Sequence, residues 1–244
     1  MQAFGLTDPG AVRTENQDVF AIEQLEDGSI LAVVCDGMGG AKAGNVASHL
    51  ALEVFTNEVK RSMDARLTEE EIALMLDGAA ALANNAVYEQ ASVSRDYSGM
   101  GTTLVAALVR ENIAYFLNVG DSRAYHLEED DIHLVTVDHS VVEMMIRRGE
   151  ITREEARRHP VKNLITRAIG TMDTVQTDLF REELAEGDSL LLCSDGLSNL
   201  LNDQEILFEV SQGSKEDCCR RLVDIVMSRG APDNVTAVLV TCDD

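Results

Sequence analysis

The sequence is poor in basic residues and has no long apolar run. Its 20 Lys and Arg stand against 43 Asp and Glu, which gives a formal net charge of −23. Lys and Arg supply most of the affinity of proteins for nucleic-acid phosphates and anionic lipids, so this balance argues against nucleic-acid and membrane partners. No apolar run approaches the roughly 18 residues of a membrane span, and no secretory signal is present. We therefore expect a soluble, cytoplasmic protein.

The cysteines and prolines exclude further classes. The five cysteines, an odd number, show no disulfide spacing and no CxxC pair, and no HExxH helix offers a zinc site. Such thiols are typical of small core side chains in a reducing compartment. With only 3 Pro and no divider rich in Pro, Gly or Ser, the 26.6 kDa chain is predicted to form a single domain over residues 1–244.

The most informative stretch that is present is Asp-Gly-Met-Gly-Gly, from Asp36 to Gly40. It follows the apolar run 30–35, and a carboxylate at the end of a buried strand is costly unless a cation or a hydrogen-bond donor meets it. The glycines allow a sharp turn and let backbone carbonyls approach a ligand closely. Taken alone, the stretch is also compatible with an ordinary turn.

The same pattern recurs at three more predicted strands. Asp121 and Asp195 each follow an apolar run, and Asp233 lies just before one. If these strand ends converge, their carboxylates form an all-oxygen cluster, which selects hard divalent cations such as Mg²⁺ or Mn²⁺. Four copies at strand ends favour such a cluster over four unrelated turns.

Hydrophobic periodicity predicts strands joined by short turns, together with paired helices. The predicted strands are 19–22, 30–35, 103–109, 113–119, 123–127, 132–137, 189–193 and 235–241. The predicted helices with both ends given are 43–59, 203–210 and 214–228. Two capping boxes, Thr68 with Glu71 and Thr152 with Glu155, predict the starts of two more helices. Hairpin-linked strands with paired helices fit a layered α+β sandwich better than a parallel βαβ sheet.

Positive charge gathers in one insert, residues 140–170, which carries seven basic and four acidic residues. In an anionic protein this insert is either a docking surface or anion-steering lid, or a solvated helical face. Arg13 lies apart from it, just before the first predicted strand. Near a metal cluster its planar guanidinium would clamp a phosphate, and a plain surface-loop arginine is the alternative.

Together these motifs resemble the type 2C metal-dependent protein serine/threonine phosphatases, the PPM family, in their compact bacterial form. The resemblance covers essentially the whole chain, with seven motifs in the family's order. They are residues 13–18, 36–40, 99–103, 119–123, 138–140, 194–196 and 233–234. The resemblance implies a four-layer α-β-β-α sandwich, with two antiparallel sheets packed face to face, helix pairs outside and a flap at about 140–170.

The resemblance also implies a role for each acidic motif. Asp36 would bridge two metal ions, and Asp195 and Asp233 would complete the first site. The Gly37 carbonyl would join the second site. Asp121 would share a third ion with Asp195, so that the chain would hold two to three Mn²⁺ or Mg²⁺ ions.

Further roles are implied around the ions. Asp18 would orient metal-bound water from outside the ligand set, Arg13 would bind the substrate phosphate, and Arg147 and Arg148 of the flap would contact substrate. The implied activity is hydrolysis of phosphoserine and phosphothreonine in proteins by a metal-activated water. We expect a monomer that opposes bacterial serine/threonine kinases.

The chain departs from the family near the second metal and at the residues that could donate a proton. Gln17 stands where eukaryotic members carry a glutamate that reaches the second metal through water, so that negative charge is absent here. Met38 replaces a histidine proposed there as general acid. Ala41 stands where many bacterial relatives carry a histidine. The leaving group must then be protonated by metal-bound water or by another group. Lys42 and His139 are weak candidates, and His139 is better explained as structural.

Two other functions share part of the pattern. A metal-dependent phosphodiesterase or nuclease would use the same carboxylates, but it fits the acidity of the chain poorly. A catalytically inactive binding module on the same fold would be marked by the loss of Asp36, Asp195 or Asp233, and all three are present. The sequence therefore favours the phosphatase.

Overall fold

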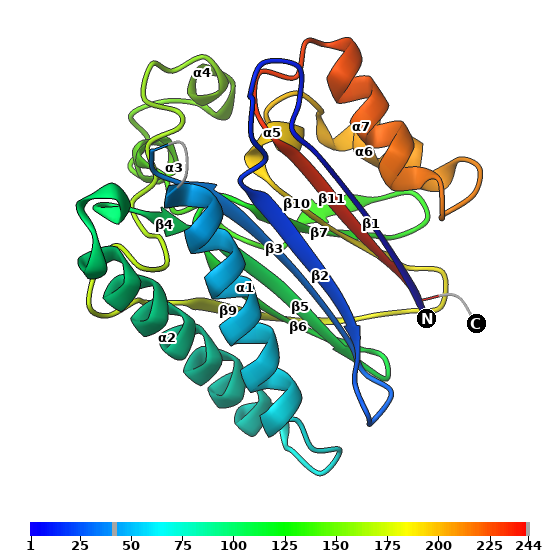
Figure 1. The fold of residues 1–244 in the computed structure, drawn as a ribbon. Coiled ribbons are helices and arrows are strands. Elements are labelled where there is room, and N and C mark those ends of the chain that lie inside the picture. The colour runs from blue at the N-terminus through cyan, green and yellow to red at the C-terminus, as the bar shows by residue number, and fades with distance from the viewer. Residues whose placement is uncertain (41–42, 243–244) are drawn as a thin grey trace.

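The computed structural model describes residues 1–40 and 43–242. Two antiparallel sheets pack face to face, and helices cover both outer faces, which gives four layers (Figure 1). Figure 1 shows α1 and α2 over one sheet and α6 and α7 over the other. This arrangement confirms the predicted α-β-β-α sandwich. Among the described residues, no helix is long and apolar enough to cross a membrane.

The first sheet has its strands in the order β1-β11-β10-β7-β8. Their bounds are Gln2–Asp8 (β1), Val235–Thr241 (β11), Ser189–Cys193 (β10), Arg123–Leu127 (β7) and Ile132–Leu134 (β8). The central strands β11 and β10 are buried along their whole length, because the second sheet covers one face and helices cover the other. That double burial explains their continuous apolar runs.

The second sheet follows the order β2-β3-β5-β6-β9, with the short strand β4 paired to the end of β3. The bounds are Asp18–Gln24 (β2), Ile30–Met38 (β3), Leu104–Arg110 (β5), Ile113–Val119 (β6), Asp178–Glu183 (β9) and Gly101–Thr102 (β4). The sequence suggested that Asp36 lies at the end of its strand. Strand β3 continues two residues past Asp36, so this aspartate lies inside the strand.

The helices form two outer layers and an insert. Over the second sheet lie α1 (Ala43–Ser62) and α2 (Glu69–Val93), which is followed by the single turn η1 (Arg95–Tyr97); over the first lie α5 (Asp195–Ser198), α6 (Asp203–Ser211) and α7 (Cys218–Ser228). The predicted capping box opens α2, where Thr68 and Glu71 exchange side-chain and backbone hydrogen bonds. A second predicted box, Thr152 with Glu155, opens α4 (Arg153–Arg157) of the insert.

Apolar side chains fill the three spaces between the four layers. Phe55 of α1 is buried between the helices and the second sheet, Phe116 is buried between the two sheets, and Leu222 of α7 is buried between the helices and the first sheet. Four of the five cysteines are also buried and the fifth, Cys242, is partly buried; all are free thiols, as predicted for core residues. This packing fixes the position of one sheet relative to the other, and with it the positions of the loops at the end of the sandwich.

The insert 140–170 is tied to the sandwich at its base. Val141 N donates to Leu164 O, Thr166 N donates to His139 O, and Thr102 and Ile169 exchange two backbone hydrogen bonds. Between these ties lie α3 (Val141–Arg147) and α4. In Figure 1 the insert stands at the end of the sandwich where α1 begins.

Several boundaries differ from those predicted. Strand β8 ends at Leu134 and not at 137, because the backbone N–H groups of Val135 and Thr136 both turn to Ala124 O. Helix α7 begins at Cys218 and not at 214, after a left-handed residue at Gly213 and a turn. Strands β1, β4 and β9 and helices α3 and α5 were not predicted from the sequence.

Candidate metal centre

Aspartates from both sheets meet at one end of the sandwich. Asp36, Asp121, Asp195 and Asp233 line a single cleft of about 240 Å³. They come from different elements: β3, the turn between β6 and β7, the start of α5, and the residue pair before β11. The convergence predicted from the four sequence motifs is therefore present. Gly37 and Arg13 line the same cleft.

Asp18 lies directly behind this cleft. It pairs with Asp36 across β2 and β3, which places two carboxylates opposite each other on neighbouring strands, an unfavourable pairing without a counterion. Its Oδ2 atom accepts hydrogen bonds from Ser194 Oγ at 2.6 Å and Thr236 Oγ1 at 2.8 Å. Its Oδ1 atom is buried and has no hydrogen-bond partner among the described residues.

The backbone of Asp36 is held by a hydroxyl network. Its amide donates to Thr103 Oγ1 at 2.9 Å, and its carbonyl accepts from the Thr103 amide and from the Thr102 hydroxyl. Thr103 Oγ1 in turn lies 2.7 Å from Ser122 Oγ, next to Asp121. These bonds fix the position of the Asp36 side chain relative to the Asp121 turn.

The carboxyl groups raise one another's pKa values. Burial is the largest cause in each case, followed for Asp36 by the charge of Asp18 and for Asp121 by the charge of Asp195; both pKa values lie well above the ordinary range. Burial and the neighbouring Asp233 raise the pKa of Asp195 to about 6. The pKa of Asp18 also rises to about 6, because its burial outweighs its two hydroxyl donors. Ionised together, these groups need positive charge nearby.

Arginine supplies only part of that charge. Arg13 Nη2 donates to Asp233 Oδ2 at 2.8 Å, and about half of the Arg13 side chain is exposed. The unpartnered Asp18 oxygen and the facing carboxylates therefore fit divalent cations, whose preferred ligands are carboxylate and carbonyl oxygens.

Glycine is required where elements approach the cleft. A Cβ atom on Gly37 would overlap the Gly44 carbonyl oxygen at the start of α1, and one on Gly196 would overlap the Asn234 carbonyl oxygen. The Asp-Gly pairs thus let β3 pack against α1 and let α5 pack against the start of β11. The sequence motif reflects this packing as well as ligand approach.

Asn234 is a site residue that sequence reasoning left without a role. Its side-chain oxygen accepts from Gln17 N at 2.9 Å, and its Nδ2 donates to the carbonyls of Pro9 and Glu15. It thereby anchors the loop that carries Arg13. The signal was present, because a buried amide directly after Asp233 and before an apolar strand needs hydrogen-bond partners.

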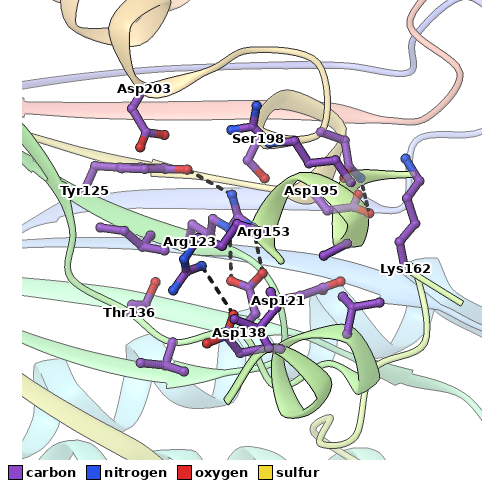
Figure 2. Close-up of a pocket in the computed structure, with 18 residues that line it drawn as sticks. Asp121, Arg123, Tyr125, Thr136, Asp138, Arg153, Lys162, Asp195, Ser198 and Asp203 are labelled. Carbon is purple, nitrogen blue, oxygen red and sulfur yellow. Dashed lines mark hydrogen bonds and ion pairs between the residues drawn. The ribbon is translucent and has the colours of Figure 1, made fainter. Parts of the chain in front are cut away.

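A second cleft of about 380 Å³ adjoins the first and shares Asp121 and Asp195 with it. Figure 2 shows Arg123 at its centre, between Asp138 and Tyr125. Arg123 binds Asp138 through two hydrogen bonds, at 2.9 Å and 2.7 Å, and donates to Tyr125 Oη at 3.2 Å. This pair neutralises Asp138, whereas Asp121 lines both clefts.

The insert contributes to the second cleft with residues other than those predicted. Arg153, Arg157 and Lys162 line the cleft. Arg147 and Arg148 are exposed, lie outside the lining of both clefts, and make surface ion pairs with Glu143 and Glu150 respectively.

The remaining positions singled out in the sequence divide clearly. Gln17 and Met38 line the aspartate cleft, where Gln17 brings no charge and Met38 has no acidic proton. His139 is buried, accepts from Gly120 N at 3.1 Å and lies 3.2 Å from Asp178, which is the structural role expected for it. Ala41 and Lys42 lie outside the described residues.

Comparisons with known proteins agree with this geometry. The family profile of Protein phosphatase 2C matches residues 11–239. The serine/threonine phosphatase stp of Listeria innocua is 38% identical over 244 residues, covering 98% of this chain and 95% of that protein. The crystal structure of the serine/threonine phosphatase Stp1 from Staphylococcus aureus superposes with a TM-score of 0.94 at 36% identity, covering 100% and 96% of the two chains.

A further solved structure bears on the metal. The catalytic domain of the serine threonine protein phosphatase PstP, in complex with 2 manganese ions, matches with a TM-score of 0.88 at 32% identity, covering 100% of this chain and 98% of that one. The sandwich and its aspartate cleft define a metal-dependent phosphatase. The chain belongs to the protein phosphatase 2C family and is a protein serine/threonine phosphatase.

Proposed function

We propose that this phosphatase hydrolyses phosphoserine and phosphothreonine at the aspartate cleft, and that Asp36, Asp195 and Asp233 hold its divalent cations there. The observation that carries the proposal is the set of aspartates that face one cleft, together with the raised pKa values of Asp36 and Asp195 and the one Asp18 oxygen that has no hydrogen-bond partner in the described part of the chain.

The ligand roles follow from position. Asp36 pairs with Asp18 across β2 and β3 and faces the same cleft as the other carboxylates, which suits it to bridge two ions, and the Gly37 carbonyl beside it would complete the second site. Asp121 and Asp195, which line both clefts, would share a third ion. Mn²⁺ or Mg²⁺ fits this all-oxygen set, with two to three ions per chain. When bound, such ions activate water as the nucleophile and neutralise charge on the phosphoryl oxygens.

Asp18 and Arg13 act around the ligands. We assign Asp18 a positioning role, because Ser194 and Thr236 fix one of its oxygens and leave the other directed away from those hydroxyls. Arg13 donates to Asp233 through Nη2, and its planar group offers further N–H donors that match phosphate oxygens. The phosphate would therefore bind at the open side of the cleft, beside Asp233.

Among the described residues that line the aspartate cleft there is no histidine, the residue proposed as general acid in other members of the family. We therefore propose that water in the cleft protonates the leaving oxygen. The consequence is a strong dependence of the rate on the acidity of the leaving group, since little protonation assists departure.

The insert 140–170 is proposed as the flap that meets protein substrates, within one domain over residues 1–244. Arg153, Arg157 and Lys162 face the second cleft, where they would bind acidic residues around the phosphorylated one. Arg147 and Arg148 remain candidate docking residues for larger substrates, because they are exposed at the end of α3.

We further propose a cytoplasmic monomer that opposes serine/threonine kinases. The five free thiols, four of them buried, support a reducing compartment. Light scattering coupled to size exclusion tests the oligomeric state, and a dimer would contradict that part of the proposal.

The test of the activity uses a phosphothreonine peptide with Mn²⁺, with chelator, and with Asp36→Asn. The exposed Asp173→Asn is the matched control. We expect phosphate release that chelator abolishes, that Asp36→Asn lowers by at least about 100-fold, and that Asp173→Asn leaves unchanged. Activity that survives both chelator and Asp36→Asn would refute the assignment, and cleavage of nucleic acid in place of the peptide would favour a nuclease.

A further inference from the structure

Two histidines and a glutamate meet at the edge of the sandwich, away from the aspartate cleft. His126 on β7 lies directly opposite His133 on β8, and Glu182 reaches them from β9, an edge strand of the other sheet. One ligand atom of each residue lies within 4.8 Å of the others. Five residues of nearly extended chain, about 17 Å, separate His126 from Asp121.

One atom of this cluster is buried without a partner. The side chain of His126 is only 3% exposed, and its Nδ1 makes no hydrogen bond to any described residue. The nearest Glu182 oxygen is 3.7 Å away, too far for a hydrogen bond. A buried ring nitrogen that faces a carboxylate and a second imidazole without bonding either one needs a ligand.

The other nitrogen of His126 shows which tautomer the site favours. Nε2 lies 2.9 Å from Asp188 Oδ2, which also accepts from Ala185 N at 2.8 Å. When Nε2 donates to this carboxylate, the neutral ring presents the Nδ1 lone pair to the cluster. A carboxylate that accepts from the far nitrogen of an imidazole is the usual support of a metal-binding histidine.

We propose that His126 Nδ1, His133 Nε2 and a carboxylate oxygen of Glu182 bind one Zn²⁺ ion. Imidazole and carboxylate suit zinc. His126 Nδ1 lies 3.7 Å from Oε2 of Glu182, and His133 Nε2 lies 3.5 Å from its other oxygen, Oε1. With one oxygen taken from Glu182, the three ligand atoms lie within 4.8 Å of one another, whereas neighbouring ligands of a tetrahedral zinc with bonds of about 2.1 Å are roughly 3.4 Å apart. His133 and Glu182 are 43% and 31% exposed, which gives the ion an entry path and leaves a fourth position to water.

This site was not expected from the sequence, which has neither a CxxC pair nor an HExxH helix. Its ligands lie on three strands and are brought together only by the β7–β8 pairing and by the packing of the two sheets. A zinc ion there would clamp the edge of one sheet to the edge of the other. It would stabilise the sandwich at the end opposite to the catalytic cleft, and its loss would not remove any residue of that cleft.

The alternative occupant of the same space is a proton. His126 would then carry hydrogens on both nitrogens, held between Asp188 and Glu182. The two states differ at Nδ1 of His126, which holds the ion in one state and a hydrogen in the other.

The experiment counts zinc by equilibrium dialysis of the whole chain, first stripped with chelator, at fixed free Zn²⁺ and pH 7.5. The aspartate cleft also binds divalent ions, so the comparison is between variants. His133→Gln should bind one zinc fewer than wild type, whereas His49→Gln, at an exposed position on α1, should match wild type. Asp188→Asn should weaken the affinity of this zinc by about 10- to 100-fold.

Histidine ¹⁵N chemical shifts of the unmodified protein give a second readout that does not depend on a variant's folding. Zinc should shift the Nδ1 resonance of His126 and the Nε2 resonance of His133 while leaving His49 unchanged. Equal zinc in all variants, or a His126 ring that stays protonated on both nitrogens in the presence of zinc, would overturn the proposal.

Discussion

Removal of the metal ions is expected to make the stability of this phosphatase fall as the pH rises. In the metal-free protein, burial raises the pKa of Asp18 and of Asp195 from 3.8 to about 6. A folded-state pKa above the unfolded value means that the folded state binds the proton more tightly. The stabilisation is therefore complete below about pH 3.8 and is lost as the pH rises through about 6.

The magnitude follows from these two groups. Each rise in pKa corresponds to about 3 kcal/mol of unfolding free energy that is present at low pH and absent at neutral pH. Part of it is already lost at pH 4.5, so the loss between pH 4.5 and 7.5 should be about 2 kcal/mol for each group and about 4 kcal/mol for both, a large part of the 5–15 kcal/mol typical of a domain. Asp36 and Asp121 act in the same direction.

Urea unfolding in chelator, repeated across this pH range, measures the effect. Asp195→Asn should flatten the dependence by about half, whereas the exposed Asp173→Asn should shift it only slightly, as a control for the general negative charge. Saturating Mn²⁺ should reverse the trend, because ionised carboxylates bind the ion more tightly. A metal-free stability that is flat or increases from pH 4.5 to 7.5 would refute the reasoning.

Three further predictions concern single positions and the leaving group. Asp18→Asn should lower Mn²⁺ affinity or turnover by about 10- to 100-fold, measured by Mn²⁺ titration of the peptide assay, and full activity would rule out its positioning role. Gly196→Ala should cost about 3 kcal/mol in urea unfolding, because its Cβ would overlap the Asn234 carbonyl; an unchanged midpoint would contradict that contact. Across a series of aryl phosphates, kcat/KM should rise steeply as the leaving phenol becomes more acidic, and a flat series would point to a protein general acid.

The sequence predicted the elements that bury apolar runs or carry strong local signals. Strands β10 and β11 match their predicted bounds, because both are apolar throughout, and the capping boxes of α2 and α4 are present. Strand β9 was missed because it is an edge strand with alternating exposure and several charges. The single-turn helix α5 is too short to show a helical period.

The aspartate cleft could be predicted from the repeated aspartate pattern, but the contacts that hold its side chains in place could not. The hydroxyls of Ser194 and Thr236 meet Asp18 only because β11, which pairs with β10, packs against β2 of the other sheet. The bidentate pair of Arg123 with Asp138 likewise depends on the chain turning back after β8. Such contacts join residues far apart in the sequence, and one sequence does not reveal them.

The central claim is that Asp36 joins the metal ions of the cleft. Electron paramagnetic resonance of Mn²⁺, titrated into the metal-free protein at neutral pH, tests it most directly. Wild type and Asp173→Asn should show a spin-coupled pair of ions, and Asp36→Asn should lose the coupling and bind fewer ions. An Asp36→Asn protein that binds the same number of coupled ions with the same affinity would contradict the account.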